Sequence, residues 1–272
     1  MKSRSILPII AFIGLPSAAL AQGHADQDSG LQVTISGGIV SAPSFVGDDD
    51  YQTSIFPNVT LRYGDRLEAS LRGIEYTAII GDGWKAGGIL GYDFGREEAP
   101  DASDFMISGE ASTDLIGLGD VDGTIEIGGF VAYEAGPFAA HFELRQGVDG
   151  GHDGLHGEAR AQYRGRFDAM ALPVFFGVGP KISFGDDAYN SAYFDVSAAQ
   201  SAASGISEYD AGGGINSYGL GANVMVPLSA QTSLIGFVDY EQLTGDVGNS
   251  SIVQERGSQD QVRAGVFLNY TF

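Results

Sequence analysis

Two closely spaced histidines are the residues of this chain best suited to chemistry. His152 and His156 are four residues apart, Asp153 lies between them, and His141 is nearby. On a helix this spacing would place both imidazoles on one face, where they could bind zinc. Several glycines surround the pair, which favours a turn running into a strand, where the two histidines share a face but lie about 13 Å apart. We therefore expect a water-facing turn and no metal site.

Acidic and glycine-rich segments are the next candidates. The aspartates at 48–50 and 186–187 could supply oxygen ligands to calcium, but the alternating oxygens and central glycine of an EF-hand loop are missing. Gly212 to Gly214 lacks the Gly-Lys-Ser/Thr ending of a phosphate-binding loop. We interpret all three segments as solvated loops.

No arrangement typical of an enzyme is found. The chain contains no Gly-x-Ser-x-Gly sequence, and its four histidines are scattered. The sequence therefore predicts a protein that is not an enzyme, with no catalytic residues, no metal ligands and no cofactor.

The elements that would position these residues alternate in polarity. In the final segment, 260–272, every second residue is apolar, and the other face is mostly polar. Successive side chains of a strand point to opposite faces, and this length suits a tilted strand crossing a bilayer. The apolar residues are Val262, Ala264, Val266, Leu268, Tyr270 and Phe272.

Alternating segments recur along the chain and predict an all-β fold, an antiparallel transmembrane β-barrel of about twelve strands, with ten as the alternative. The terminal strand should pair with the first strand and close the sheet. The expected strands are 31–39, 55–63, 67–71, 84–94, 125–133, 138–144, 155–163, 172–178, 189–197 (the weakest), 218–226, 234–240 and 260–272.

Charges such as Glu143, Arg145, Glu158 and Arg160 fall on the polar face of these segments, as expected for a barrel, where a charge facing lipid at mid-bilayer costs about 2–4 kcal/mol. Aromatic residues at strand ends favour a lipid interface. Periodicity alone does not separate this arrangement from a soluble sandwich.

Segment 96–123 fits this strand pattern poorly. We expect it on the periplasmic side, with a short helix at 108–118 or an extra hairpin. Acidic loops at 41–51, 200–210 and 244–260 are expected outside.

Export is expected from the first residues. Lys2 and Arg4 precede a short apolar run and an Ala19-Leu20-Ala21 cleavage signal, so residues 1–21 are predicted to be a signal peptide and 22–272 one barrel domain. The chain has no cysteine, and its later apolar runs are interrupted too often by Gly, Asp or Ser to form a transmembrane helix.

The chain is strongly acidic. With 35 acidic and 14 basic residues, its net charge of −21 disfavours nucleic acid as a partner.

Several segments, in order, resemble the MipA/OmpV family of outer-membrane proteins, named for the MltA-interacting protein. Two departures are Asp195, where the family has Gly, and Ser251, where it has Pro. The segments are 43–51 with Pro57 (Pro-x-aromatic-x-Gly-x-Asp-x-Tyr), 117–124 (Gly-Leu-x-Asp-Ile/Val-Asp), 151–154 (Gly-His-x-Gly), 189–194 (Tyr-x-x-x-Tyr-Phe), 240–246 (Tyr-x-x-Leu-x-Gly-Asp), 250–253 and the terminal Tyr-x-Phe.

The resemblance implies a barrel in the outer membrane of a Gram-negative cell, in contact with outer-membrane lipid. It implies a non-enzymatic scaffold that joins a murein transglycosylase to a peptidoglycan synthase, and it brings no catalytic residues. Two alternatives stay open: a passive pore for small solutes, which the polar inner face and acidic excess would suit, and a surface adhesin that binds through its acidic loops.

Overall fold

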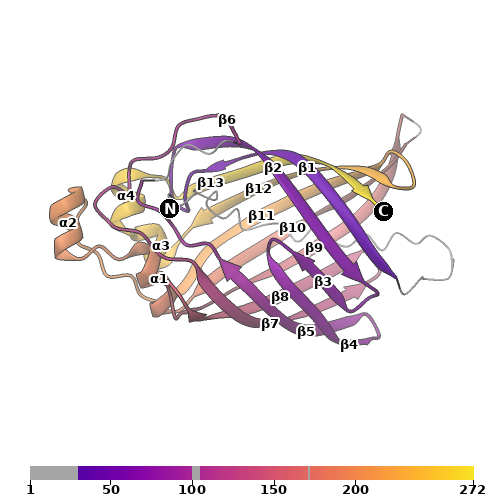
Figure 1. Cartoon of the computed structure of the whole chain (residues 1–272), viewed down its shortest axis with the longest axis horizontal. Coiled ribbons are helices and arrows are strands. Elements are labelled where there is room, and N and C mark those ends of the chain that lie inside the picture. Colours follow the sequence, from indigo (N-terminus) through magenta and orange to yellow (C-terminus); the bar gives the residue numbers. More distant parts are fainter. Residues whose placement is uncertain (1–29, 100–104, 171) are drawn as a thin grey trace.

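The computed structural model describes residues 30–99, 105–170 and 172–272, and it is a closed antiparallel barrel (Figure 1). The sheet has thirteen strands, and all but the three-residue β6 form the wall, so the prediction of a twelve-stranded barrel is confirmed. The predicted signal peptide lies outside the described residues. None of the described helices is long and apolar enough to cross a membrane.

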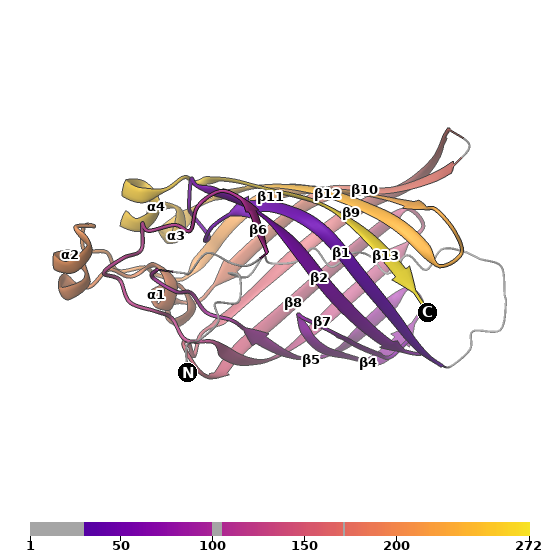
Figure 2. The same ribbon diagram turned by 45° about the horizontal axis from the view of Figure 1, so that its top comes forward.

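The wall strands follow one another around the barrel in chain order, tilted to its axis (Figure 2). The strands are β1 (Leu31–Pro43), β2 (Tyr51–Tyr63), β3 (Leu67–Ser70), β4 (Gly73–Gly81), β5 (Trp84–Asp93), β6 (Met106–Ser108), β7 (Thr124–Ala135), β8 (Phe138–Asp149), β9 (Leu155–Ala169), β10 (Leu172–Gly185), β11 (Gly214–Pro227), β12 (Thr232–Leu243) and β13 (Asp260–Thr271). The helices are α1 (Asp187–Phe194), α2 (Ala198–Ser204), α3 (Gly245–Asn249) and α4 (Ser251–Arg256).

The two faces of the wall have opposite character. Apolar side chains point outward, and Ile39 and Leu268 are about half exposed, at 51% and 50%. Charged side chains point inward, where Arg145 and Asp239 are only 6% and 4% exposed. A water-soluble sandwich would bury its apolar face, so this inversion is the arrangement of a transmembrane barrel.

The first and last strands close the barrel. β1 pairs with β13 from Thr34 opposite Thr271 to Ser41 opposite Ala264, and on its other side β1 pairs along its whole length with β2. The Phe272 N–H donates to the Val33 carbonyl at 2.9 Å. The predicted partnership of the terminal strand with the first is therefore confirmed, and it satisfies both edges.

The two ends of the barrel differ strongly. At one end, the turn end, lie the start of β1, the end of β13 and short turns such as 64–66 and 136–137 (Figure 1). At the other end, the capped end, lie the four helices and the long connections. Segment 96–123 belongs to the capped end, since β5 runs from the turn end to it and β7 runs back. The sequence predicted this segment on the periplasmic side, but it lies at the end opposite the start of β1 and the end of β13, which in the usual orientation of such barrels is the outer end.

Two strand assignments from the sequence are also wrong. Residues 189–197 form no strand; most belong to α1, whose N-cap residue, Asp186, accepts a hydrogen bond from the Tyr189 N–H. Residues 73–81 form β4, which was missed because β3 is short and turns back at Gly73. The two errors compensate, which leaves the count at twelve. In the stretch 108–118, where a short helix was one expectation, the structure has a turn at 114–117. β6 pairs with β2 near its start, at Thr53 and Ser54.

Candidate functional site

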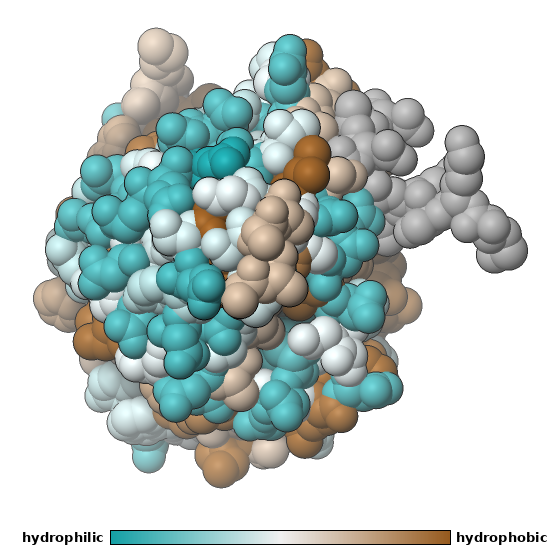
Figure 3. Space-filling view, turned by 90° about the vertical axis from the view of Figure 1, so that its left-hand side faces the viewer, coloured by the Kyte–Doolittle hydropathy of each residue, from teal (hydrophilic) through white to brown (hydrophobic). Residues whose placement is uncertain are grey.

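The capped end has its own small core. One apolar cluster joins the loop after β1 to segment 96–123 and to the helices, and a second packs α1 and α3 against the end of β12. The first contains Phe45, Leu115, Leu118, Val196, Ile206 and Ile252; the second contains Phe194, Ala211, Leu243, Val247 and Val253. Viewed from outside, the cap surface is mainly hydrophilic (Figure 3). The cap is thus a folded lid with an apolar interior and a water-facing surface.

Asp48 is a buried acid at the centre of this cap. It is fully buried, forms a β-bridge with Gly257, and its carboxylate accepts from the Asp50 N–H at 3.1 Å. The carboxylates of Asp49 and Asp114 lie close to it, and Arg256 lies 3.9 Å from Asp114. Burial is the main cause that raises the pKa of Asp48 to about 6, and the charges of Asp114 and Asp50 add to the shift.

A pH dependence follows for this loop. Because the folded pKa of Asp48 lies above its unfolded value, the charged form destabilises the cap, and protonation relieves this as the pH falls from 7 towards 5. We expect Asp48→Asn to stabilise the cap by about 1–2 kcal/mol relative to the wild type at pH 7.5. At pH 5 this difference between the variant and the wild type should largely disappear. Amide hydrogen exchange of residues 44–50 at both pH values measures it. Faster exchange in the variant at pH 7.5 would contradict the expectation.

Ion pairs cross the lumen beneath the cap. Arg72, at the β3–β4 turn, donates to Glu143 of β8 at 3.0 Å, and Arg145 lies between Glu143 and Glu126 of β7. On the opposite wall, Lys181 of β10 contacts Glu241 of β12 at 2.6 Å, and Glu241 also pairs with Arg263 of β13. Phe56, Phe237 and Phe267 line another part of the lumen. Paired charges and aromatic rings therefore line the interior.

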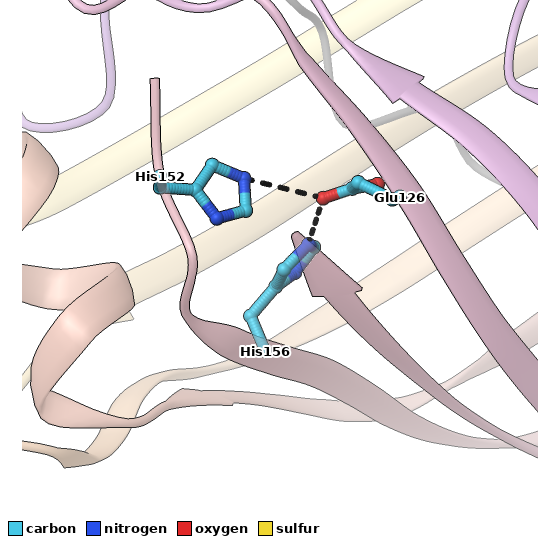
Figure 4. A group of neighbouring side chains, drawn as sticks. All are labelled: Glu126, His152 and His156. Carbon is cyan, nitrogen blue, oxygen red and sulfur yellow. Dashed lines mark hydrogen bonds and ion pairs between the residues drawn. The ribbon is translucent and has the colours of Figure 1, made fainter. Parts of the chain in front are cut away.

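Glu126, His152 and His156 gather at the top of this lumen, below α1 (Figure 4). Glu126 is the third residue of β7, and His156 the second residue of β9. His152 lies in the 150–154 turn before β9, and its N–H donates to Thr124 Oγ1 at 3.1 Å. The turn folds close to the wall because Gly147 has no side chain: a Cβ there would lie 2.6 Å from His152 Nδ1.

The three side chains converge on one carboxylate oxygen. Glu126 Oε1 is 2.6 Å from His156 Nε2 and 3.5 Å from His152 Nε2. Asp93 Oδ2, at the end of β5, lies 3.8 Å from His152 Nε2, and Asp93 Oδ1 accepts from the Gly95 N–H. The Tyr189 ring stacks on His156 at 4.3 Å and meets His152 edge-on at 5.1 Å.

This geometry corrects the interpretation of the two histidines. A shared strand would hold them apart, but His152 is in a turn, and the two ring centroids are 6.0 Å apart. Nothing in the sequence marked Glu126 or Asp93 as part of a site, because each has the pattern of an ordinary polar residue in a strand. The glycine run 150–154 was the available clue, because it allows a turn tight enough to fold back. Asp186 and Asp187 instead cap α1 and bind the Gly213 N–H.

Comparison with known protein families gives a clear result. The family model described as "MltA-interacting protein MipA" matches residues 35–272, which is most of the chain. The chain belongs to the MipA family. With its apolar outer wall, this MipA-family protein is an outer-membrane β-barrel. Barrels of this kind usually have their short turns in the periplasm and their long connections outside.

Other comparisons are less informative. A search of curated proteins finds no match. Solved structures similar to this MipA-family barrel include CdiB from Acinetobacter baumannii (9% identity, TM-score 0.37, covering 89% of this chain) and an anion-selective porin from Comamonas acidovorans (12%, 0.33, 89% of this chain and 99% of the porin). OmpT of Vibrio cholerae has 6% identity and a TM-score of 0.36, over 89% of this chain and 97% of OmpT. This chain spans 60% of the length of CdiB.

Most segments that carry the MipA resemblance in the sequence meet at the capped end; Pro57, within β2, and the terminal Tyr-x-Phe, at the turn end, are the exceptions. Tyr189 and Tyr193 both contact the ring of His152. Gly47 donates its N–H to the Gln261 side chain, and Leu243 packs on Val253 and Phe194. Segments far apart in the chain therefore build a single unit, the lid with the histidine cluster beneath it.

Proposed function

We propose that this chain is a non-enzymatic interaction protein that binds a murein transglycosylase at its periplasmic end, and that it thereby brings this enzyme near a peptidoglycan synthase. The observation that carries the proposal is membership of the MipA family, whose name records an interaction with MltA. A barrel anchored in the outer membrane would hold such enzymes close to the murein layer.

The cap and the ion pairs inside the barrel support an interaction role over an open pore. The lid packs on two apolar clusters, and the pairs Arg72–Glu143 and Lys181–Glu241 bridge strands across the polar interior. A barrel of twelve strands is intermediate between small barrels, which side chains fill, and open porins, which are wider and have a water-filled channel, so the cap and the ion pairs inside it decide how open it is. A protein built this way gains little as a passive channel and offers its two ends as surfaces.

The turn end offers the surface that a periplasmic enzyme would meet. Its turns are short, and exposed apolar residues lie beside them: Met170 is fully exposed and Phe138 is 60% exposed. Exposed ion pairs flank them, such as Arg164 with Glu134 at 2.7 Å. Mixed apolar and charged rims of this kind are typical of transient protein interfaces.

Site-specific photo-crosslinking in cells tests the proposal. A crosslinking residue replaces either Ala230, exposed in the turn between β11 and β12, or Ala202, exposed on α2 of the cap. We expect crosslinks to a murein transglycosylase from position 230 and none from position 202, because the enzyme would contact only the periplasmic end. Mass spectrometry of the adducts identifies the partner.

Either of two results would count against the proposal. Absence of a murein enzyme among the adducts from position 230 would remove the proposed partner. Sustained conductance of the purified barrel in planar bilayers would favour the pore hypothesis, for which the polar pocket lined by Arg160, Lys181 and Asp239 would be the path.

A further inference from the structure

We propose that Glu126, His152 and His156 form a binding site for a divalent transition-metal ion of the zinc class, which fastens the cap to the barrel wall. The proposal is independent of the murein partner. The three residues come from β7, the 150–154 turn and the start of β9. An ion bound to them would tie these three segments together directly below α1.

The donor set has the chemistry of a metal site. One ligand atom from each residue lies within 4.8 Å of the others, so movements of about 1 Å by the side chains would bring all three to the 2.0–2.2 Å distances of zinc ligands. Two imidazoles and one carboxylate suit Zn²⁺ and its neighbours, whereas Ca²⁺ and Mg²⁺ prefer sites made only of oxygen. Asp93, 3.8 Å from His152 Nε2, is close enough to supply a fourth ligand.

The strongest single observation is the state of His152. Its side chain is completely buried, yet neither ring nitrogen has a hydrogen-bond partner among the described residues. Buried polar groups nearly always have partners, because desolvation without one costs about 1–3 kcal/mol. His152 Nε2 faces Glu126, 3.5 Å away (Figure 4). A metal ion placed between them would satisfy this nitrogen.

The surroundings hold the ligands in position and supply a negative charge. Arg145 NH1 lies 3.5 Å from Glu126 Oε2, which orients the carboxylate so that Oε1 faces the histidines. Gly95 fixes Asp93 in the same way through Oδ1. Glu126 and Asp93 contribute two negative charges here and Arg145 one positive charge, and the resulting negative charge favours a cation. Such outer contacts are typical of metal sites, where they fix the orientation of the ligands.

The site is enclosed yet reachable. The rings of Tyr189 and Tyr193 both contact the ring of His152 and wall the site. The His156 side chain is 22% exposed, on the side of the lumen. An ion can therefore enter from the lumen, while α1 covers the other side.

Binding of Zn²⁺ to the untagged mature chain, refolded in detergent, tests the inference. Titration calorimetry in excess Mg²⁺, which occupies the acidic surface, should give one Zn²⁺ per chain. His152→Ala and His156→Ala should each weaken the affinity at least tenfold, since each removes one ligand. His141→Ala is the matched control, because His141 also faces the lumen but stacks on Phe130 outside the site, and its affinity should be unchanged.

A second measurement guards against misfolded variants. Heat-modifiable gel mobility reports whether each variant is a closed barrel, and the visible spectrum of bound Co²⁺ reports whether nitrogen ligands are present. Tenfold losses in folded His152→Ala and His156→Ala, with a nitrogen-type Co²⁺ spectrum in the wild type, support the site. Absence of Zn²⁺ binding, equal affinity in wild type and both variants, or an equal loss in His141→Ala overturns it.

Discussion

Replacing Glu241 with alanine is expected to lower the free energy of unfolding of the barrel by about 3 kcal/mol or more. Glu241 is 7% exposed, and its Oε1 lies 2.6 Å from Lys181 Nζ and also pairs with Arg263, while Oε2 accepts from Ser217 at 2.8 Å. The substitution removes the carboxylate shared by these two cations and leaves their charges poorly compensated in the lumen. Urea unfolding in detergent, followed by the fluorescence of the single tryptophan, Trp84, measures the loss.

Glu134→Ala provides the control. Glu134 also pairs with an arginine, Arg164, at 2.7 Å, but its side chain is 52% exposed. An exposed ion pair contributes at most about 1 kcal/mol, so this variant should unfold close to the wild type. Similar losses in the two variants would show that the buried network has no special role in holding the barrel together.

Gly38→Val should disrupt barrel closure. Gly38 lies in β1 at the seam with β13, opposite Phe267, and a Cβ at this position would lie 2.5 Å from both the Phe267 ring and the Val266 carbonyl oxygen. Backbone oxygen cannot move aside without breaking the seam, so we expect a loss of about 3 kcal/mol. The measurable result is a smaller heat-modifiable fraction after refolding and a lower urea midpoint.

The neighbouring glycine is a matched control for this seam. Gly37 faces the opposite way, and a Cβ there would meet nothing within 4 Å. Gly37→Val should therefore stay within about 0.5 kcal/mol of the wild type, as expected for a surface substitution. If both variants refold like the wild type, the packing of Phe267 across the seam is looser than the structure indicates.

The strands illustrate what could be predicted and where prediction failed. Alternation of side chains is a local property, so the segments around Ile39 and Leu268 were recognisable without any tertiary information. Residues 73–81 were missed because they form a hairpin with the four-residue β3, too short for a clear period. The aromatic run at 189–194 looked like a strand, but the cap from Asp186 and the packing of Phe194 in the lid make it helical.

The candidate site could not be predicted from local sequence patterns for a related reason. The glycines around His152 and His156 had indicated a turn running into a strand, which is what the chain forms, but the expected separation of about 13 Å assumed that both histidines lie on the strand. Their proximity depends on a turn that folds back over a strand without a side chain at Gly147. Glu126 and Asp93 join them from strands more than twenty residues earlier, which only the register of β5, β7, β8 and β9 brings together.

The sequence by itself determined the alternating polarity of the strands, which follows from short-range periodicity, and the family with the barrel it implies, which follow from ordered motifs. The count of twelve strands agreed with the structure only because one missed strand offset one wrongly assigned strand. Only the tertiary structure decided which face meets lipid, that segment 96–123 belongs to the cap, and that Glu126, His152 and His156 share one site. Closing a sheet sets the positions of residues far apart in the chain through strand register and tilt, and no local pattern contains that information.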